Sequence, residues 1–409
     1  MARKPMRRSP RCEAHWRRNH RRLAVLTEAS PGRGSPAREQ SATLIVFFVA
    51  GFAMASFAPL VPFVKARTGV GEGALGLLLL CLGVGSLITM FLAGALAARF
   101  GCRRVILASG VPLCLSLPLL ASLSDPFALG MVLLVFGGAI GSIDVTMNIQ
   151  AIIVERDSGR AMMSGFHGLF SVGGIAGSVC MTAALGAGAS PIAATLGVVA
   201  VIIVALVRAA PRLLAHASEQ RPTMFAVPRG IVLIIGVLCF VAFQAEGAVL
   251  DWSGVYLSGT QGMATAYAGL GYVAFTVAMT IGRLTGDRIV GRFGGTAVIL
   301  FGGLCSASGF ALTSLASSWQ PALIGFALIG LGCSNIVPVL FTRVGMQTLM
   351  PEHIAVSAIS TLGYSGILTG PALIGLIAHV SSLSTAFLIL AVLQLGVAAS
   401  GRLTSHRRR

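Results

Sequence analysis

Twelve long apolar runs constrain this chain more than any other feature of its sequence. Each is close to the length of about 20 residues that a helix needs to cross the hydrocarbon core of a bilayer. Apolar residues make up 55% of the 409 residues and charged residues 11%, more apolar surface than a water-exposed domain can hide. The sequence therefore predicts an all-α integral membrane protein with twelve transmembrane helices. The predicted spans are 42–64, 74–97, 104–122, 127–152, 162–185, 190–207, 230–251, 264–286, 296–315, 320–342, 354–378 and 383–401.

The loops between these spans divide the basic residues very unevenly. If odd-numbered spans run outward, 28 of the 30 Lys and Arg residues lie on one side, and only Lys65 and Arg67 lie on the other. Basic residues accumulate in the cytoplasmic loops of membrane proteins. We therefore expect a multi-pass protein of the cytoplasmic (inner) membrane, with both termini and the central loop in the cytoplasm.

An internal repeat divides the chain into two halves. Arg99-Phe100-Gly101 follows the second span, and Arg292-Phe293-Gly294 follows the eighth, so the two copies lie 193 residues apart. Such a repeat indicates two pseudo-symmetric six-helix bundles. The predicted organisation is an Arg-rich disordered cytoplasmic tail at 1–41, an N-terminal bundle at 42–207, a cytoplasmic linker at 208–229, a C-terminal bundle at 230–402 and a basic tail at 403–409.

The loop after the second span resembles a signature of the major facilitator superfamily, a Gly, three residues and then Asp-Arg-x-Gly-x-Arg-Arg. The second half echoes it in Gly286-Asp287-Arg288. Residues 144–150 and 246–253 also look like a poorly characterised bacterial inner-membrane branch of the family. The resemblance covers about residues 42–402 and implies solute transport by twelve helices, without naming a solute. The first-half residues that match the signature are Gly94, Arg99, Gly101, Arg103 and Arg104.

Ala98 stands where the family signature has its acid. In the family, that acid and the neighbouring basic residues help to hold the cytoplasmic gate shut. The resemblance therefore implies a gating role for the first-half motif and for Asp287 and Arg288, with Asp287 expected to carry more of the closure. Anchoring of the basic loop at the membrane surface is the alternative interpretation.

Acidic residues are rare inside the predicted spans. Only Asp144, Glu246 and Asp251 of the 13 acids fall there. An ionisable group at bilayer depth costs at least about 2.5 kcal/mol, so such a residue is a functional candidate by default. Asp144 and Glu246 are the predicted proton-coupling residues.

Asp144 lies at the predicted mid-depth of the fourth span and shares a helical face with Gly137, Gly141 and Asn148. Small residues beside a polar pair indicate a face that packs on other helices or borders a cavity. We expect a cavity here; a neutral Asp144 bonded to a neighbouring helix is the alternative.

Other polar residues in the spans extend this candidate cavity. In the fifth span, His167 and Ser171 match the depths of Asn148 and Asp144, although a lone His can also reach the membrane interface. The absence of a mid-span Lys or Arg disfavours strongly anionic substrates. The remaining predicted substrate-cavity residues are Gln244, Asn335 and Tyr364.

The seventh span carries two acids that point in different directions. Five residues of helix separate Glu246 from Asp251, which places them roughly 140° apart. Trp252 follows Asp251 near the predicted outer end, where Trp is typically an interfacial anchor. We therefore take Glu246 as the buried acid and Asp251 as an outer-gate or interface residue.

Other classes of protein fit less well. Gly363-Tyr364-Ser365-Gly366 has the GxSG form of a serine nucleophile, but no His lies where it could act as the base. The chain has no Walker A sequence, and neither the eight scattered cysteines nor any other spacing indicates a metal site or cofactor. The Arg-rich tail lacks the interleaved aromatic residues of a nucleic-acid-binding module.

The sequence thus predicts a monomeric secondary active transporter. We expect it to move a small solute by alternating access between its two halves, coupled to protons. A proton-driven drug or metabolite efflux pump and a transport-inactive membrane sensor are the alternatives. Uptake and efflux stay open, as do symport, antiport and facilitated diffusion.

Overall fold

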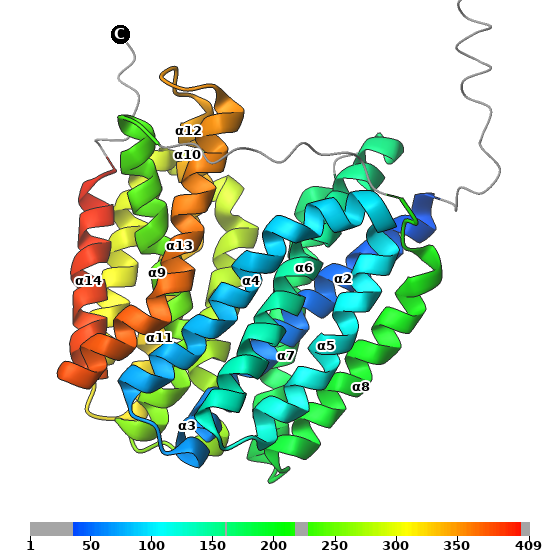
Figure 1. The fold of residues 1–409 in the computed structure, drawn as a ribbon. Helices are drawn as coiled ribbons and strands as arrows, with labels where there is room; N and C mark the ends of the chain where they lie inside the picture. The colour runs from blue at the N-terminus through cyan, green and yellow to red at the C-terminus, as the bar shows by residue number, and fades with distance from the viewer. Residues whose placement is uncertain (1–35, 160–161, 217–227, 402–409) are drawn as a thin grey trace, which may run out of the picture.

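The computed structural model describes residues 36–159, 162–216 and 228–401, which form a bundle of helices (Figure 1). Within these ranges no strand is present. The helices of the N-terminal half are α2 (Pro36–Phe57), continued by η1 (Ala58–Leu60) and α3 (Val61–Thr68), α4 (Glu72–Phe100), α5 (Cys102–Ser122), α6 (Pro126–Ser158), α7 (Met163–Gly186) and α8 (Pro191–Ala209), followed by η2 (Ala210–Arg212). Those of the C-terminal half are α9 (Ile231–Gly259), η3 (Thr265–Tyr267), α10 (Leu270–Leu315), α11 (Trp319–Cys333), α12 (Ile336–Gly345), α13 (Glu352–Val380) and α14 (Leu383–Ala399).

The helices match the twelve predicted spans. Among the described residues, eleven helical stretches are long and apolar enough to cross a membrane, and α14 adds a shorter apolar helix of 17 residues. Two spans, the eighth and ninth, run together as α10, which bends at Gly294. The prediction of an all-α membrane protein with two six-helix bundles is confirmed.

Local chemistry explains where several helices begin and end. The Asp125 carboxylate accepts a hydrogen bond of 2.7 Å from the backbone N–H of Ala128, in front of a proline in the first turn of α6. At the end of α5, the guanidinium of Arg67 donates to the carbonyl oxygens of Leu120, Ala121 and Leu123, at 2.8 to 2.9 Å. The last carbonyls of a helix have no partner within it, so Arg67 satisfies groups that would otherwise be exposed.

The Arg-Phe-Gly repeat adopts the same conformation in both halves. Gly101 has φ 83° and ψ 155°, and Gly294 has φ 79° and ψ 153°, values that a residue with a Cβ rarely adopts. In each copy the arginine guanidinium stacks over the following phenylalanine ring, at 5.2 Å in the first half and 5.5 Å in the second. The repeat therefore marks a shared structural turn.

This shared turn revises the expected correspondence of Asp287. Asp287 precedes Gly294 by seven residues, so its counterpart in the first half is Gly94, and the residue opposite Ala98 is Gly291. The second half therefore does not keep the motif acid at the position that Ala98 occupies. Asp287 lies one helical turn further into α10.

The predicted boundaries of the polar segments differ in part from the structure. Helix α2 begins at Pro36, so the last residues of the predicted tail at 1–41 are helical. After η2, Leu213 and Leu214 are buried, and the backbone N–H of Leu214 donates to the Gln150 side chain at 3.2 Å. The first part of the linker is thus packed against the N-terminal bundle. The rest of the predicted tail (1–35), linker residues 217–227 and the tail at 403–409 lie outside the described residues.

The two halves meet on the face opposite the start of α2 and the end of α14 (Figure 1). There α4 packs closely against α13, because glycines at the contact let the backbones approach. A Cβ on Gly76 would lie 2.5 Å from the carbonyl oxygen of Pro371, and Leu368 packs on Gly83, about two turns further along α4. Trp252 of α9 is fully buried and lies against Gly375 of α13, on the same side.

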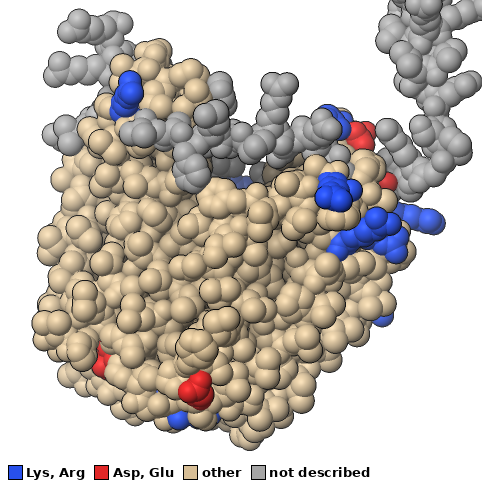
Figure 2. All heavy atoms as spheres, viewed as in Figure 1, with Lys and Arg blue, Asp and Glu red and all other residues tan. Residues whose placement is uncertain are grey.

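Toward the face where α2 begins and α14 ends, here called the termini face, the halves separate (Figure 1). Nothing lies within 4 Å of a Cβ built on Gly94 of α4 or on Gly165 and Gly168 of α7. Figure 1 shows the helices of the two halves diverging in this direction, and the space-filling view dips between the two lobes at the upper edge (Figure 2). The structure is therefore closed at one face and open at the other.

The basic residues follow the same polarity. Most of the Lys and Arg side chains visible in Figure 2 lie toward the termini face. Lys65 and Arg67, the two exceptions in the sequence, both have partners at the opposite face. Lys65 forms an ion pair with Glu72, and Arg67 binds the end of α5.

Candidate functional site

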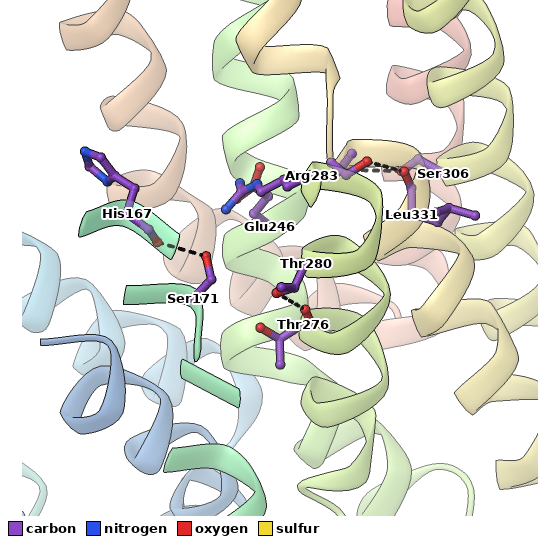
Figure 3. Close-up of polar contacts among 10 residues, drawn as sticks. His167, Ser171, Glu246, Thr276, Thr280, Arg283, Ser306 and Leu331 are labelled. Atoms are coloured by element: carbon purple, nitrogen blue, oxygen red, sulfur yellow. Dashed lines mark hydrogen bonds and ion pairs between the residues drawn. The ribbon is translucent and has the colours of Figure 1, made fainter. Parts of the chain in front are cut away.

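An ion pair between α9 and α10 is the most unusual feature inside the bundle. The Arg283 guanidinium lies 3.4 Å from the Glu246 carboxylate, whose side chain is 17% exposed (Figure 3). The other carboxylate oxygen of Glu246 is buried and has no hydrogen-bond partner in the part of the chain that the structure describes. Charges removed from water need such a partner, because an unpaired one is strongly destabilising.

The position of Arg283 corrects a prediction from sequence. The eighth span was predicted to end at residue 286, which would place Arg283 near the membrane surface. Instead α10 remains helical up to the bend at Gly294, so Arg283 lies ten residues, or roughly 15 Å, inside the helix end at Phe293. A basic residue therefore lies near mid-depth, and the argument against anionic substrates fails.

A polar stripe on α10 leads to this pair. Thr276, Thr280 and Arg283 follow one another at the spacing of a single helical face. The Thr280 hydroxyl donates to the backbone carbonyl of Thr276 at 2.8 Å. This face is not among the features predicted from the sequence. The i, i+4, i+7 spacing indicates it, and the Arg-Phe-Gly repeat marks where the helix ends and so places Arg283 well inside it.

Helix α7 of the N-terminal half lies across from this stripe. Figure 3 shows Ser171 on the side of α7 nearer to α10, with its hydroxyl donating to the carbonyl of His167 at 3.3 Å. The His167 ring points away from Glu246 and packs edge-on against Phe47 of α2, with 5.2 Å between ring centroids. Arg283 is nevertheless close enough for its charge to act on His167. Ser171 thus borders the space between the halves more directly than the His167 ring does.

Asp144 occupies the middle of α6 as predicted. Gly137 and Gly141 pack closely against Leu82 and Ser86 of α4, while Asp144 is only half-buried. The Asn148 amide donates to the backbone carbonyl of Asp144 at 2.8 Å rather than to its carboxyl group. Within the described residues, the Asp144 carboxyl has neither an ion-pair nor a hydrogen-bond partner.

Tyr364 of α13 lies near one acid from each half. Its side chain is 43% exposed, stacks on Phe243 at 5.7 Å between ring centroids, and lies within electrostatic reach of both Asp144 and Glu246. These acids come from different halves. The structure therefore brings Asp144, Glu246 and Tyr364 to one region, as a shared cavity requires.

Two other candidate cavity residues serve in helix packing. The Asn335 amide, in the break between α11 and α12, donates to the Gly282 carbonyl at 2.8 Å and so fixes α10 next to Arg283. Gln244 is 6% exposed and faces Gly370 where α9 packs on α13. Asn335 and Gln244 therefore contact the helices that carry the site, α10 and α13.

The prediction for the outer end of the seventh span is partly wrong. Helix α9 continues to Gly259, two turns beyond Asp251, so Trp252 is not at the membrane interface. Trp252 is fully buried, its ring N–H has no hydrogen-bond partner among the described residues, and Asp251 is 8% exposed. Both residues belong to the closed region between the halves, because the extra turns carry α9 past them.

The GxSG sequence has a packing role. Gly363 accommodates the Phe243 ring, and Gly366 approaches the backbone of Phe240, so both glycines allow close contact of α13 with α9. The Ser365 hydroxyl donates to the Leu362 carbonyl of its own helix at 2.7 Å. This arrangement is that of a packed membrane helix.

Two helical bundles that close at one face around polar groups from both halves define a membrane transporter for small molecules. The sequence comparisons give the same class. Residues 43–353 match the family model of the Major Facilitator Superfamily, and the chain belongs to that family. An uncharacterised MFS-type transporter of Yersinia pestis is 53% identical over 365 residues, covering 89% of this chain and 95% of the relative. The membrane protein MosC of Rhizobium meliloti is 31% identical over 378 residues, covering 91% of this chain and 92% of MosC.

Solved structures share the fold at low sequence identity. A point mutant of the nucleoside transporter NupG superposes with a TM-score of 0.76 at 12% identity, covering 90% of this chain and all of that one (100%). A variant of the fucose:proton symporter FucP of E. coli superposes with a TM-score of 0.59 at 16% identity, over 90% of this chain and 98% of FucP. These likenesses establish the fold and leave the solute undefined.

Proposed function

We propose that the protein is a proton-coupled secondary transporter that moves a small polar solute across the cytoplasmic membrane by alternating access. The observation that carries the proposal is that Tyr364 lies within electrostatic reach of both Asp144 and Glu246, which come from different halves. The halves touch beyond this region at one face only, as expected for one of the two end states of such a cycle. The protein works as a monomer, since each chain contains both halves.

The two acids have different roles in this proposal. Glu246 is tied to Arg283, whereas the Asp144 carboxyl is free to gain and lose a proton as the site changes sides. A carboxyl that binds a proton on one side and releases it on the other couples flux to a proton gradient. We therefore assign proton transfer to Asp144, and assign to Glu246 and Arg283 the orientation of the solute.

The solute is small and rich in hydrogen-bonding groups. Arg283, Ser171, Thr276 and Tyr364 offer donors and acceptors but form a site with almost no net charge when Glu246 is ionised. The structural neighbours include a nucleoside transporter and a fucose:proton symporter, which makes nucleosides and sugars the first solutes to test.

The termini face is the cytoplasmic side in this proposal, because most of the described Lys and Arg side chains visible in Figure 2 lie toward it. Closure of that face would bring the motif ends of α4 and α10 toward each other. Gly94, Arg99, Gly101, Arg103 and Arg104 would take part from one half, and Asp287 and Arg288 from the other.

The proposal is tested by finding a solute and then driving its transport. Purified protein is screened by thermal shift against nucleosides, monosaccharides, organic acids and drug-like cations. Compounds that stabilise it are then offered to proteoliposomes with an imposed pH gradient. Accumulation that collapses with a protonophore supports proton coupling, whereas equilibration without accumulation supports facilitated diffusion.

Two matched variants assign the proton site. Asp144→Asn resembles the permanently protonated carboxyl, so it should abolish gradient-driven accumulation while solute exchange persists. Glu246→Gln should instead weaken solute binding. If Asp144→Asn still concentrates the solute and Glu246→Gln does not, the proton site is on α9.

A further inference from the structure

A basic cavity lies at the termini face, away from the proposed solute site. Its volume is about 650 Å³, and it lies where α4 ends, α5 begins and the linker leaves α8. Phe100, at the end of α4, is 40% exposed beside it. The cavity is lined by Ala98, Arg99, Phe100, Gly101, Arg103, Arg104, Ala215 and His216.

The charge of this cavity is uncompensated. Among the described residues, three arginines and no acid line it, and Ala98 occupies the position at which the family motif has an acid. Within the described residues, none of Arg99, Arg103 and Arg104 forms an ion pair. Guanidinium groups that line the same cavity repel one another, so an anion placed among them would be favoured.

The cavity has a fixed wall on the linker side. The backbone N–H of Arg103 donates to the Leu214 carbonyl at 2.8 Å, and Leu213 and Leu214 are buried. A Cβ on Gly101 would collide with the Ala215 backbone, so glycine is required for this close approach. The linker therefore holds Ala215 and His216 over the end of α4.

The second copy of the motif lacks these features. Nothing lies within 4 Å of a Cβ built on Gly294, so no described segment covers that turn as the linker covers Gly101. Arg288 and Arg292 supply a comparable basic charge there. The turn at Gly294 therefore serves as a control, because it has basic residues but no covering linker among the described residues.

We propose that this cavity binds the phosphate group of an anionic phospholipid from the leaflet at the termini face. It lies at the ends of two membrane-spanning helices, the level of lipid headgroups, and a phosphate diester supplies the negative charge that Ala98 does not. Guanidinium groups suit phosphate because they donate paired hydrogen bonds in a fixed plane. The bound lipid would take the place of the missing acid at the motif. This inference does not depend on the identity of the transported solute.

The test compares lipid retention by the full-length protein and two charge-matched variants. Phosphatidylglycerol or phosphatidylcholine is titrated into purified protein, and retained lipid is counted by native mass spectrometry. Arg103→Gln with Arg104→Gln should weaken phosphatidylglycerol retention by about 30-fold, from the usual contribution of each basic residue near an anionic headgroup. Arg288→Gln with Arg292→Gln should leave it nearly unchanged, and phosphatidylcholine should show no difference between variants.

A third variant keeps every arginine. Ala98→Asp introduces a carboxylate beside Arg99 and should lower phosphatidylglycerol retention, and unchanged retention would overturn the proposal. Equal losses in the two double variants would also contradict it, since they would indicate unspecific attraction to basic loops. Binding of inorganic phosphate by protein that retains no more phosphatidylglycerol than phosphatidylcholine would assign the cavity to a soluble phosphate and overturn the lipid assignment. Circular dichroism and gel filtration of each variant establish that it is folded.

Discussion

At the scale of single residues, the Glu246–Arg283 pair combines a nearly buried carboxylate with a guanidinium that is 41% exposed. Such a pair holds its two charges at one place without adding net charge to the site. The exposed side of Arg283 remains available for a solute, while Glu246 fixes where the guanidinium lies. Arg283 is therefore both a binding group and a counter-ion.

Removal of one partner should cost more stability than removal of both. Arg283→Gln leaves Glu246 without its counter-ion and should destabilise the protein by about 1–2 kcal/mol, less than for a fully buried pair because Arg283 is partly exposed. Adding Glu246→Gln to Arg283→Gln should recover most of that loss. Thermal unfolding of the three variants in detergent measures the effect.

A matched variant on the same face controls for packing. Thr280→Val keeps the side-chain volume and removes a hydroxyl that bonds only to its own helix, so it should change the melting temperature little. A double variant less stable than Arg283→Gln would show that the two charges do not depend on each other.

Some of these residues could be predicted from the sequence, and the reason others could not is physical. Asp144 and Glu246 were identified because acids are rare at membrane depth. Arg283 lies inside the predicted span 264–286 but only three residues from its end, because the hydropathy pattern ends this span before Asp287, whereas the helix continues to Gly294. The sequence predicts Asn335 and Gln244 as cavity residues, but polarity in a span does not reveal whether the partner of a side chain is a solute or a neighbouring backbone.

At the scale of helices, close contact between α4 and α13 closes the face opposite the termini. Glycines make that contact possible at one end of α4, whereas Gly94 toward the other end faces open space. The same helix therefore belongs to the closed region at one end and to the open region at the other.

Gly76→Ala should weaken the closed face, because its Cβ would lie 2.5 Å from the Pro371 carbonyl oxygen. Overpacking of this kind typically costs 1–3 kcal/mol, enough to raise the population of the open form at least about fivefold. The buried Ser253, replaced by cysteine in a cysteine-free background, should then react faster with an impermeant maleimide added from that face.

Gly94→Ala is the control on the same helix, and it should leave the labelling rate unchanged. Equal rates in the Gly76→Ala and Gly94→Ala proteins would mean that the α4–α13 contact does not close this face.

Helix identity was easier to predict than helix ends. The length of the apolar runs alone predicts the spans, because a helix needs about 20 consecutive apolar residues only when it crosses a membrane. The ends depended on contacts distant in sequence, such as Arg67 binding the end of α5 and the linker packing through Leu214 on Gln150. A local pattern does not contain those partners.

At the scale of the whole molecule, the distribution of basic residues predicts which face is cytoplasmic. In a background without the eight cysteines, Thr348→Cys in the loop between α12 and α13 should react with an impermeant reagent only after cells are permeabilised. Ser124→Cys, in the loop between α5 and α6, should react in intact cells. The reverse pattern would invert the proposed orientation.

The central claim is that the two halves alternate between closure at one face and closure at the other. Spin labels at Arg156 and Leu349 report on the termini face, and labels at Phe127 and Val380 report on the opposite face, with each pair joining the two halves. Electron–electron distance measurements are made in proteoliposomes at two pH values, with and without a solute found in the screen. We expect the Arg156–Leu349 distance to shorten in the same conditions in which the Phe127–Val380 distance lengthens. Two distances that stay fixed under conditions in which solute flux is measured would contradict alternating access.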